Sequence, residues 1–221
     1  MLATATHDTA GQIASLWHLY LAVILTVGVL VTVAILGATV RFRRRSAAWP
    51  SQSTTAPRLE AAWLVLITVI VAGLLFETLR TESRVDALAA SPALRVQVTA
   101  FQWQWQFSYP GTGIVQGGAG VSSTHPHFAD LVVPAGRPVE FDLRSADVLH
   151  AFFIPAMRFK RYAFPNSTNR FVLTFPAPGR MLGECAQFCG WDHAEMRFNV
   201  RVLSPAAFSR WLSAHGSGSP G

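Results

Sequence analysis

The residue types best suited to chemistry gather in one short stretch, residues 183–196, which reads GECAQFCGWDHAEM. Four of its side chains fall in the spacing C-x3-C-x3-H-x2-M: Cys185, Cys189, His193 and Met196. Thiolate, imidazole and thioether groups are soft or borderline ligands of the kind that copper prefers. A loop between two strands can bring them together, and His150, at the end of an earlier strand, supplies a second imidazole. This set can serve two copper ions if both sulfurs bridge them.

Other chemistries of cysteine and histidine fit the spacing less well. Zinc ligand pairs are usually C-x2-C or C-x4-C with H-x3-H, and a zinc site has no use for the Met196 thioether. A single blue-copper site needs one thiolate, which leaves the second cysteine unexplained. A redox disulfide would have C-x-x-C spacing in a helical setting, and two cysteines are a poor disulfide framework for a chain of 221 residues. We therefore predict a dinuclear copper site.

Two apolar runs precede this region. Residues 13–40 contain no charged side chain apart from the titratable His18, and they exceed the roughly 20 residues that span a bilayer core. Residues 61–79 are apolar until Glu77, which can pair with Arg80 at i,i+3 spacing. The start of the chain lacks the positive region of a signal peptide, so we expect the first helix to be retained. Residues 1–80 are predicted to form a transmembrane hairpin, because helices that are apolar all round argue against a soluble protein.

The basic residues indicate how the hairpin is oriented. Arginines cluster directly after the first apolar run, in RFRRR at 41–45, whereas Trp17 and Tyr20 lie at its start. The positive-inside rule then puts the loop 46–58 in the cytoplasm and both ends of the chain outside. Because membrane anchoring accounts for these arginines, the formal charge of +6 does not indicate a nucleic acid partner. We predict a multi-pass protein of a bacterial plasma membrane, with the copper domain on the extracytoplasmic side.

After a polar linker, residues 81–91, the pattern changes from helical to alternating. In residues 94–100, apolar positions alternate with Arg, Gln and Thr, as in a half-buried strand. Further strand-like runs are separated by Gly, Pro, Asn and Ser: 129–133, 139–143, 151–154, 170–175 and 198–202. Short strands at this spacing predict a β-sandwich or barrel over residues 92–212, closed by a short helix at 205–212. We expect the tail, residues 213–221, to be disordered.

Three segments resemble the signature segments of a known family, cytochrome c oxidase subunit II: 102–105 (QWQW), 147–152 (DVLHAF) and 183–196. The two-helix hairpin is similar as well, and LEAAW at 59–63 resembles the family's motif at the start of its second helix, so the resemblance covers about residues 17–212. It implies an α+β membrane protein whose hairpin precedes a cupredoxin-like β-sandwich, or Greek-key barrel. The ligands that it implies for the dinuclear copper centre, called CuA, are His150, Cys185, the backbone carbonyl of Gln187, Cys189, His193 and Met196.

The resemblance also implies a function. The chain would be subunit II of a haem-copper respiratory oxidase, which takes electrons from a cytochrome to the oxygen-reducing subunit I while the complex translocates protons. Because the copper centre leaves no position open for a substrate, we expect no catalytic residue in this chain. Trp103 would be the exposed ring through which electrons enter. Trp103 and Trp105 are alternate residues of a predicted strand and so should face the same side, although buried core tryptophans would look the same in the sequence. Glu60 would be the mouth of a proton pathway or, more simply, a first-turn carboxylate that the helix dipole favours.

The chain departs from the family pattern in the region of the copper site. Gln187 stands where the family has a glutamate that reaches a magnesium ion shared with subunit I, and YAFPN at 162–166 lacks the family's acidic residue. An amide is a weaker magnesium ligand than a carboxylate, which weakens the expectation of magnesium but not that of copper. His125 and His127 form an H-x-H pair, which we interpret as part of a surface loop rather than as a further metal site.

The charge of the predicted copper domain bears on its electron donor. From Pro92 onward the chain has eleven basic and seven acidic residues, a formal charge of +4. Such a domain repels a basic soluble cytochrome c, so we expect a donor that is acidic or is tethered in the same assembly as subunit I and the other membrane subunits. Two alternative functions are the copper subunit of a nitric oxide reductase and a copper-delivery protein. Assays of oxygen against nitric oxide, and of copper exchange, would distinguish them.

Overall fold

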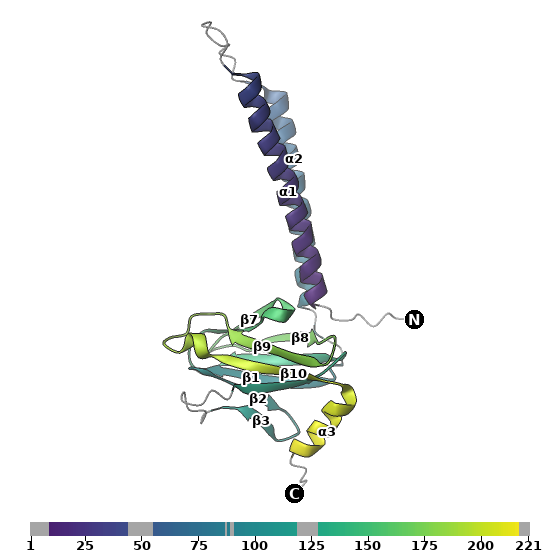
Figure 1. Cartoon of the computed structure of the whole chain (residues 1–221), viewed down its shortest axis with the longest axis vertical. Helices are drawn as coiled ribbons and strands as arrows, with labels where there is room; N and C mark the ends of the chain where they lie inside the picture. The colour runs from purple at the N-terminus through teal and green to yellow at the C-terminus, as the bar shows by residue number, and fades with distance from the viewer. Residues whose placement is uncertain (1–8, 44–54, 87, 89–90, 119–127, 217–221) are drawn as a thin grey trace, which may run out of the picture. The chain divides into compact units, whose positions relative to one another are not determined.

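The computed structural model describes residues 9–43, 55–86, 88, 91–118 and 128–216 of the chain. They divide into a helical unit, Ile13–Ser83, and a β unit formed mainly by the chain from Arg84 onward. Figure 1 draws both units, with labels on many of their elements. Several predicted features lie outside the described residues: Arg44, Arg45, most of the loop 46–58, His125, His127 and the tail from residue 217.

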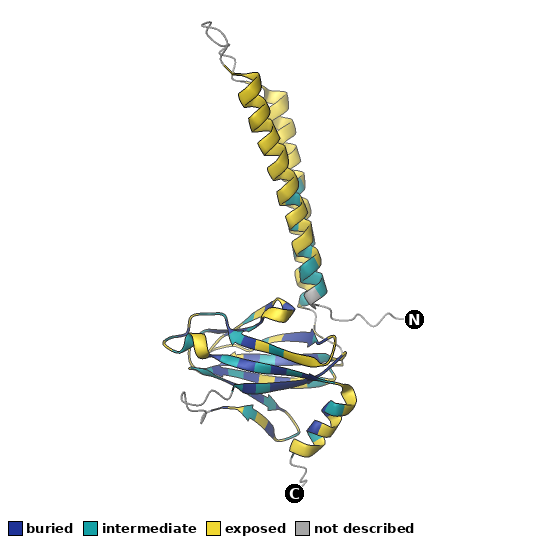
Figure 2. Cartoon of the chain, viewed as in Figure 1, coloured by how far each residue is buried: buried dark blue, intermediate teal, exposed yellow. Residues whose placement is uncertain are grey.

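The helical unit is a hairpin of two long helices, α1 (Thr9–Arg41) and α2 (Pro57–Val85). Both are long and apolar enough to cross a membrane, and their surfaces are almost wholly exposed, as Figure 2 shows. The Tyr20 hydroxyl lies 2.7 Å from Oγ1 of Thr78 and joins the two helices. Glu77 and Arg80 approach to 3.6 Å at the expected i,i+3 spacing. The predicted hairpin is therefore present within the described residues.

Helix α2 is longer than its apolar run. It begins at Pro57, a residue type suited to the first helical turn, and it continues past the predicted end at Leu79 to Val85. The polar residues after Leu79 include good helix formers, so the helix persists where the hydropathy pattern stops. The first part of the predicted linker, 81–91, is therefore helical.

The β unit is a sandwich in which the described residues form two five-stranded sheets. One sheet has the strand order β3-β2-β1-β5-β8, and the other has the order β4-β10-β9-β6-β7. β1 pairs with β5 and β4 with β10 in parallel, and the other neighbours are antiparallel. The strands are β1 (Leu94–Phe101), β2 (Gln104–Tyr109), β3 (Ile114–Gly117), β4 (Ala129–Pro134), β5 (Pro138–Ser145), β6 (His150–Ile154), β7 (Phe159–Ala163), β8 (Asn169–Thr174), β9 (Gly179–Cys185) and β10 (Arg197–Leu203).

The core lies between the two sheets and is built from alternate residues of their strands. Val96, Val98 and Ala100 of β1 are fully buried, which confirms the alternation predicted for that strand. Aromatic rings meet across the sandwich: the rings of Trp105 on β2 and Phe198 on β10 lie 5.3 Å apart. The predicted fold class, an α+β protein with an apolar hairpin and a β-sandwich, is confirmed.

Four of the described strands have no counterpart among the strand runs predicted from the sequence: β2, β3, β7 and β9. β9 lacks a regular apolar alternation and contains Gly183, which lies directly under an aromatic ring. A Cβ atom at this position would come within 2.0 Å of Cζ of Phe198. The glycine is thus required for packing, and it weakens the strand signal that a β-branched residue would have supplied.

The C-terminal helix, α3 (Pro205–His215), closes one end of the core. Ser204 caps its N-terminus, because the Ser204 hydroxyl accepts a hydrogen bond from the Ala207 N–H. Phe208 and Trp211 are buried, and the Trp211 ring lies 5.2 Å from that of Tyr109. The helix continues past the predicted end at residue 212.

Candidate metal centre

The first part of the site is the turn that leads into β6. His150 begins this strand and is fully buried. Its Nε2 atom lies 2.8 Å from Oδ1 of Asp147, and the same carboxylate accepts hydrogen bonds from the backbone N–H groups of Val148 (2.6 Å) and Gln102 (2.7 Å). Since a carboxylate only accepts, Nε2 carries the proton. The other ring nitrogen, Nδ1, faces Cys185.

The second part is the loop between β9 and β10. Cys185 ends β9, and its backbone N–H donates to the carbonyl of Met196 over 2.9 Å, which closes the base of the loop. Inside the loop, η2 (His193–Glu195) is one turn of 3-10 helix. Gly190 has a φ of +121°, a conformation that residues with a Cβ rarely adopt. This local geometry brings the C-x3-C-x3-H-x2-M residues back onto one end of the β9–β10 hairpin.

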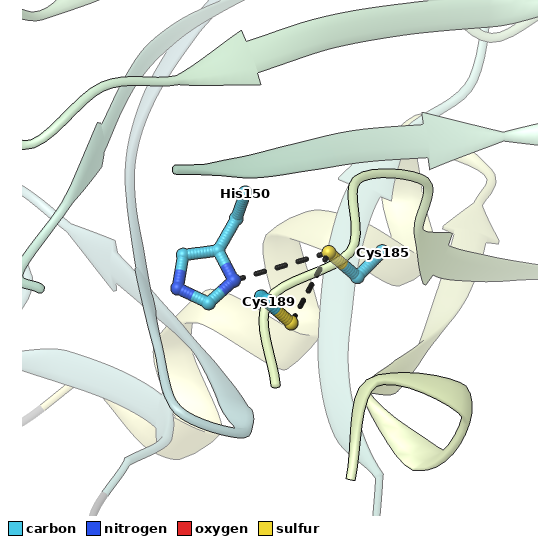
Figure 3. A group of neighbouring side chains, drawn as sticks. All are labelled: His150, Cys185 and Cys189. Atoms are coloured by element: carbon cyan, nitrogen blue, oxygen red, sulfur yellow. Dashed lines mark hydrogen bonds between the residues drawn. The ribbon is translucent and has the colours of Figure 1, made fainter. Parts of the chain in front are cut away.

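Two sulfurs and one imidazole form the centre of the site (Figure 3). Sγ of Cys185 lies 3.9 Å from Sγ of Cys189 and 3.9 Å from Nδ1 of His150. The potential ligand atoms of these three buried residues all lie within 4.8 Å of one another. Both cysteines are free thiols, so both sulfurs are available to a metal ion.

The remaining predicted ligands surround this centre. The carbonyl oxygen of Gln187 lies 3.2 Å from Sγ of Cys185. Sγ of Cys189 lies 3.5 Å from Nδ1 of His193 and 3.8 Å from Sδ of Met196. The structure therefore brings all the predicted ligand residues together around the two sulfurs, from two separate segments of the chain.

The surroundings of the two thiols shift their pKa values in opposite directions. Burial would raise the thiol pKa of Cys185, but the hydrogen bond with His150 and those with the nearby backbone outweigh it, so this pKa lies below its ordinary value. Burial and the adjacent charge of Cys185 raise the pKa of Cys189 to about 12. Burial would also lower the pKa of His150, but its contacts with Cys185 and Asp147 raise it. A metal ion that binds both sulfurs must therefore displace a firmly held proton.

The chemistry of this donor set fits copper better than zinc. The Met196 thioether is fully buried within the cluster, and zinc sites do not use thioethers. A blue-copper site uses one thiolate, whereas both sulfurs belong to this one centre. The residues present fit a soft metal that is bound by more than one thiolate.

The two tryptophans of the QWQW segment have different surroundings. Trp105 on β2 is fully buried, and its Nε1 donates to the Met196 carbonyl over 3.3 Å. Trp103 is only half-buried, lies in the turn between β1 and β2, and donates from Nε1 to the Cys189 carbonyl over 3.2 Å. Trp103 therefore lies in a turn and not on a strand, so the prediction that Trp103 and Trp105 are alternate residues of one strand is wrong for Trp103.

Glu60 belongs to the helical unit, not to this cluster. Its Oε1 atom accepts a hydrogen bond from the backbone N–H of Ala56 over 3.2 Å, at the start of α2. This contact supports the simpler interpretation, a first-turn carboxylate that stabilises the helix N-terminus. A role in a proton pathway stays a prediction.

Two further residues contact the site, and the sequence analysis gave neither a role. Asp147 orients His150, and Gln102 donates from Nε2 to the Cys189 carbonyl over 2.7 Å. A carboxylate close in sequence to a ligating histidine is a common partner for its second nitrogen, so Asp147 could have been proposed from the motif. No feature of the sequence indicated that Gln102 would contact the site.

The chain is similar to known proteins along most of its length. The model of the family described as cytochrome c oxidase subunit II, periplasmic domain, matches residues 94–203. A probable cytochrome c oxidase subunit 2 of Streptomyces avermitilis is 32% identical over 249 residues, which cover 96% of this chain and 77% of that protein. Its counterpart in Streptomyces coelicolor is 33% identical over 247 residues, with the same coverage of 96% and 77%.

A solved structure agrees with the fold of the β unit. It is the crystal structure of the periplasmic domain of subunit II of cytochrome oxidase of Bradyrhizobium japonicum, with a TM-score of 0.50 and 28% sequence identity. The match covers 58% of this chain and 96% of that one. It bears out the cupredoxin-like sandwich that the sequence motifs implied. This chain belongs to the cytochrome c oxidase subunit II family.

Proposed function

We propose that this chain is the electron-accepting subunit of a haem-copper respiratory oxidase and that it passes electrons from a cytochrome to the oxygen-reducing subunit I. The observation that carries the proposal is the convergence of two free, buried thiols and the His150 imidazole within 4.8 Å. Family membership supports it, since the relatives from Streptomyces are named as subunits of cytochrome c oxidase.

The proposed ligands of a dinuclear copper centre are the donors gathered around the two sulfurs: His150, Cys185, the backbone carbonyl of Gln187, Cys189, His193 and Met196. Their separations from the sulfurs, between 3.2 and 3.9 Å, support this set. A bound copper pair of this kind supplies a carrier for one electron. Two sulfurs that serve both ions would explain why both cysteines lie in one centre.

The contribution of the chain is a ligand set that is buried and held in place. His150 and Met196 are fully buried, and Cys185 is anchored at the end of β9 by its backbone hydrogen bond. Protein interiors are close-packed, so these side chains are expected to move little when the charge of the centre changes. Small rearrangement favours electron transfer rather than bond chemistry, which would need a place for a substrate.

Trp103 is the proposed ring through which electrons enter. It is half-buried, so one side remains accessible to a donor protein, and its indole N–H is bonded to the Cys189 carbonyl. This is a direct contact between a surface aromatic ring and a residue that carries one of the two sulfurs. Trp105 is buried behind the site, which makes it a packing residue rather than a second surface contact.

The two apolar helices support a membrane location for the proposed function. The exposed apolar surfaces of α1 and α2 support insertion in a bacterial plasma membrane beside subunit I and other membrane subunits, with the copper domain outside. Proton translocation by the complex, with Glu60 at the mouth of a pathway, belongs to the same proposal. The neutral side chain of Gln187 gives no support to a magnesium ion at the interface with subunit I.

The test uses the oxidase complex purified with the full chain. We expect the complex to hold two more copper ions than its Cys185→Ser variant, to show the spectrum of a mixed-valence copper pair, and to reduce oxygen. Ala194→Ser, at an exposed position of the same loop, is the matched control and should keep the pair. One copper ion, zinc in its place, or a preference for nitric oxide over oxygen would overturn the proposal.

A further inference from the structure

Gln102 joins the two segments that carry the proposed ligands. It lies in the turn between β1 and β2, next to Trp103. Its backbone N–H donates to Oδ2 of Asp147 over 2.7 Å, and its side-chain Nε2 donates to the Cys189 carbonyl over 2.7 Å. Asp147 in turn holds His150. One residue of a third segment therefore bridges the turn before β6 and the loop after β9.

The Cys189 carbonyl is shared between Gln102 and its neighbour. Trp103 donates to the same oxygen from Nε1 over 3.2 Å, so this one carbonyl accepts from two adjacent residues. Gly190 lies against this pair: a Cβ there would be 3.1 Å from Cζ2 of Trp103 and 3.2 Å from Nε2 of Gln102. The Trp103 ring and the Gln102 amide thus rest together on the Cys189–Gly190 peptide.

The side-chain bond of Gln102 has little to do with folding. Gln102 is exposed, and water can replace a neutral hydrogen bond at the surface at little net cost. The core of the sandwich is built from buried apolar residues that do not include it. Loss of this amide should therefore leave the fold intact. It should change only how the turn lies on the loop between β9 and β10, here called the metal loop.

We propose that Gln102 is a positioning residue for electron transfer, whose amide holds the Cys189 carbonyl in place so that Trp103 stays against the metal loop. The inference rests on the proposed function, because it assigns the Trp103 contact a role in accepting electrons. Its chemical basis is the pair of donors on one carbonyl, of which the Gln102 bond is the shorter.

The experiment uses the oxidase complex with Gln102→Met, which keeps the length of the side chain but removes the donor. Gln97→Met is the matched control, an exposed glutamine on β1, the strand that precedes the turn of Gln102. We expect Gln102→Met to keep both copper ions and the thermal unfolding temperature of the wild type. The rate of reduction of the copper pair by its cytochrome donor should fall about tenfold, since a displacement on the order of 1 Å can slow a reaction substantially. Gln97→Met should match the wild type in every measurement.

Two further variants separate positioning from general damage. Gln102→Lys restores an N–H donor and should bring the reduction rate back to within about threefold of the wild type. In a Trp103→Ala background, Gln102→Met should cause no additional slowing, because residues that act through one contact are not additive.

The outcomes distinguish this inference from the function on which it rests. A wild-type complex without the copper pair overturns the proposed function, and the inference with it. A normal wild type with an unchanged rate in Gln102→Met overturns the inference alone. So does an equal slowing in Gln97→Met, an undiminished effect in the Trp103→Ala background, or loss of copper from Gln102→Met, which would make Gln102 part of what retains the metal.

Discussion

The Nε2 atom of His150 lies 2.8 Å from Oδ1 of Asp147, and this contact decides which ring nitrogen faces the sulfurs. Burial would raise the pKa of Asp147, but the hydrogen bonds from His150 and from the backbone of Gln102 lower it below its ordinary value. The carboxylate is therefore charged at neutral pH and keeps the Nε2 proton in place. His150 is thus presented to the site with Nδ1, the nitrogen that would bind a metal ion, turned toward the sulfur of Cys185.

Asp147→Asn should weaken copper binding by about 10- to 100-fold, the range typical for residues that orient a ligating histidine. An amide carries no charge, and it can replace only part of the hydrogen bonding of a carboxylate that accepts from Val148, Gln102 and His150. Competition with a copper chelator measures the affinity. Asp142→Asn is the control, because that carboxylate pairs with Arg170 on the outer sheet surface. Equal affinities in the wild type and both variants would contradict the orienting role.

Met196→Leu should keep the copper pair and raise its reduction potential. Leucine has a similar volume, so the buried site should lose less than about 1.5 kcal/mol of stability. The sulfur of Met196 lies 3.8 Å from that of Cys189, where its electron pair can stabilise the more highly charged oxidised form of the copper pair. Leucine has no such electron pair, so the oxidised form is less stable in the variant. Redox titration of the purified complex measures the shift. An empty site in this variant would show that the thioether holds the metal rather than tunes it.

Gly190→Ala should destabilise the full chain more than Gly136→Ala. Both glycines have positive φ, and alanine costs about 1–3 kcal/mol at such positions; the cost is greater at Gly190, because its φ of +121° lies outside the left-handed helical region in which Gly136 lies at +67°. At Gly136 a Cβ meets no atom within 4 Å, whereas at Gly190 it comes within 3.1 Å of the Trp103 ring. Denaturant unfolding of both variants measures the difference. Equal losses of unfolding free energy in the two variants would mean that the Trp103 ring can move aside without cost and is not held against the loop.

The loop before α2 and the C-terminal helix α3 should differ in their access to reagents outside the cell. In a background with Cys185 and Cys189 replaced by serine, an impermeant thiol reagent should label a cysteine at Ser213 but not one at Thr55. Both positions are exposed, so the membrane alone makes the difference. The arginines at 41–45 are the physical reason, because they favour the cytoplasmic side. The reverse labelling pattern would invert the topology.

The electron donor should be acidic or tethered, because the domain from Pro92 onward carries a formal charge of +4. With an acidic soluble donor, turnover should fall steeply as salt screens the attraction, and with a tethered donor it should hardly respond. Turnover measured across a range of ionic strength separates these cases. Fast turnover with a basic cytochrome c that slows as salt is added would show that a local acidic patch outweighs the net charge.

Hydropathy and residue chemistry alone were enough to predict the membrane hairpin and the five side-chain ligands that are proposed, whereas the Gln187 carbonyl was implied only by the family resemblance. Apolar runs are local properties, so α1 and α2 could be predicted without knowledge of any tertiary contact. The ligands from Cys185 to Met196 lie in one loop, and their spacing already carried the chemistry. The ends of α2 were less certain, because helical hydrogen bonding continues beyond the apolar residues.

Only the tertiary structure decided how that loop is supported. Gln102 binds Asp147 across 45 residues of sequence and Cys189 across 87. The same turn makes Trp103 a surface contact while Trp105, two positions later, is buried in the core. Such contacts depend on which strands become neighbours. The spacing of residues along the chain does not determine which strands pair. The physical reason is that strand pairing is set by the packing of the whole sandwich core, whereas a ligand motif is set by one loop.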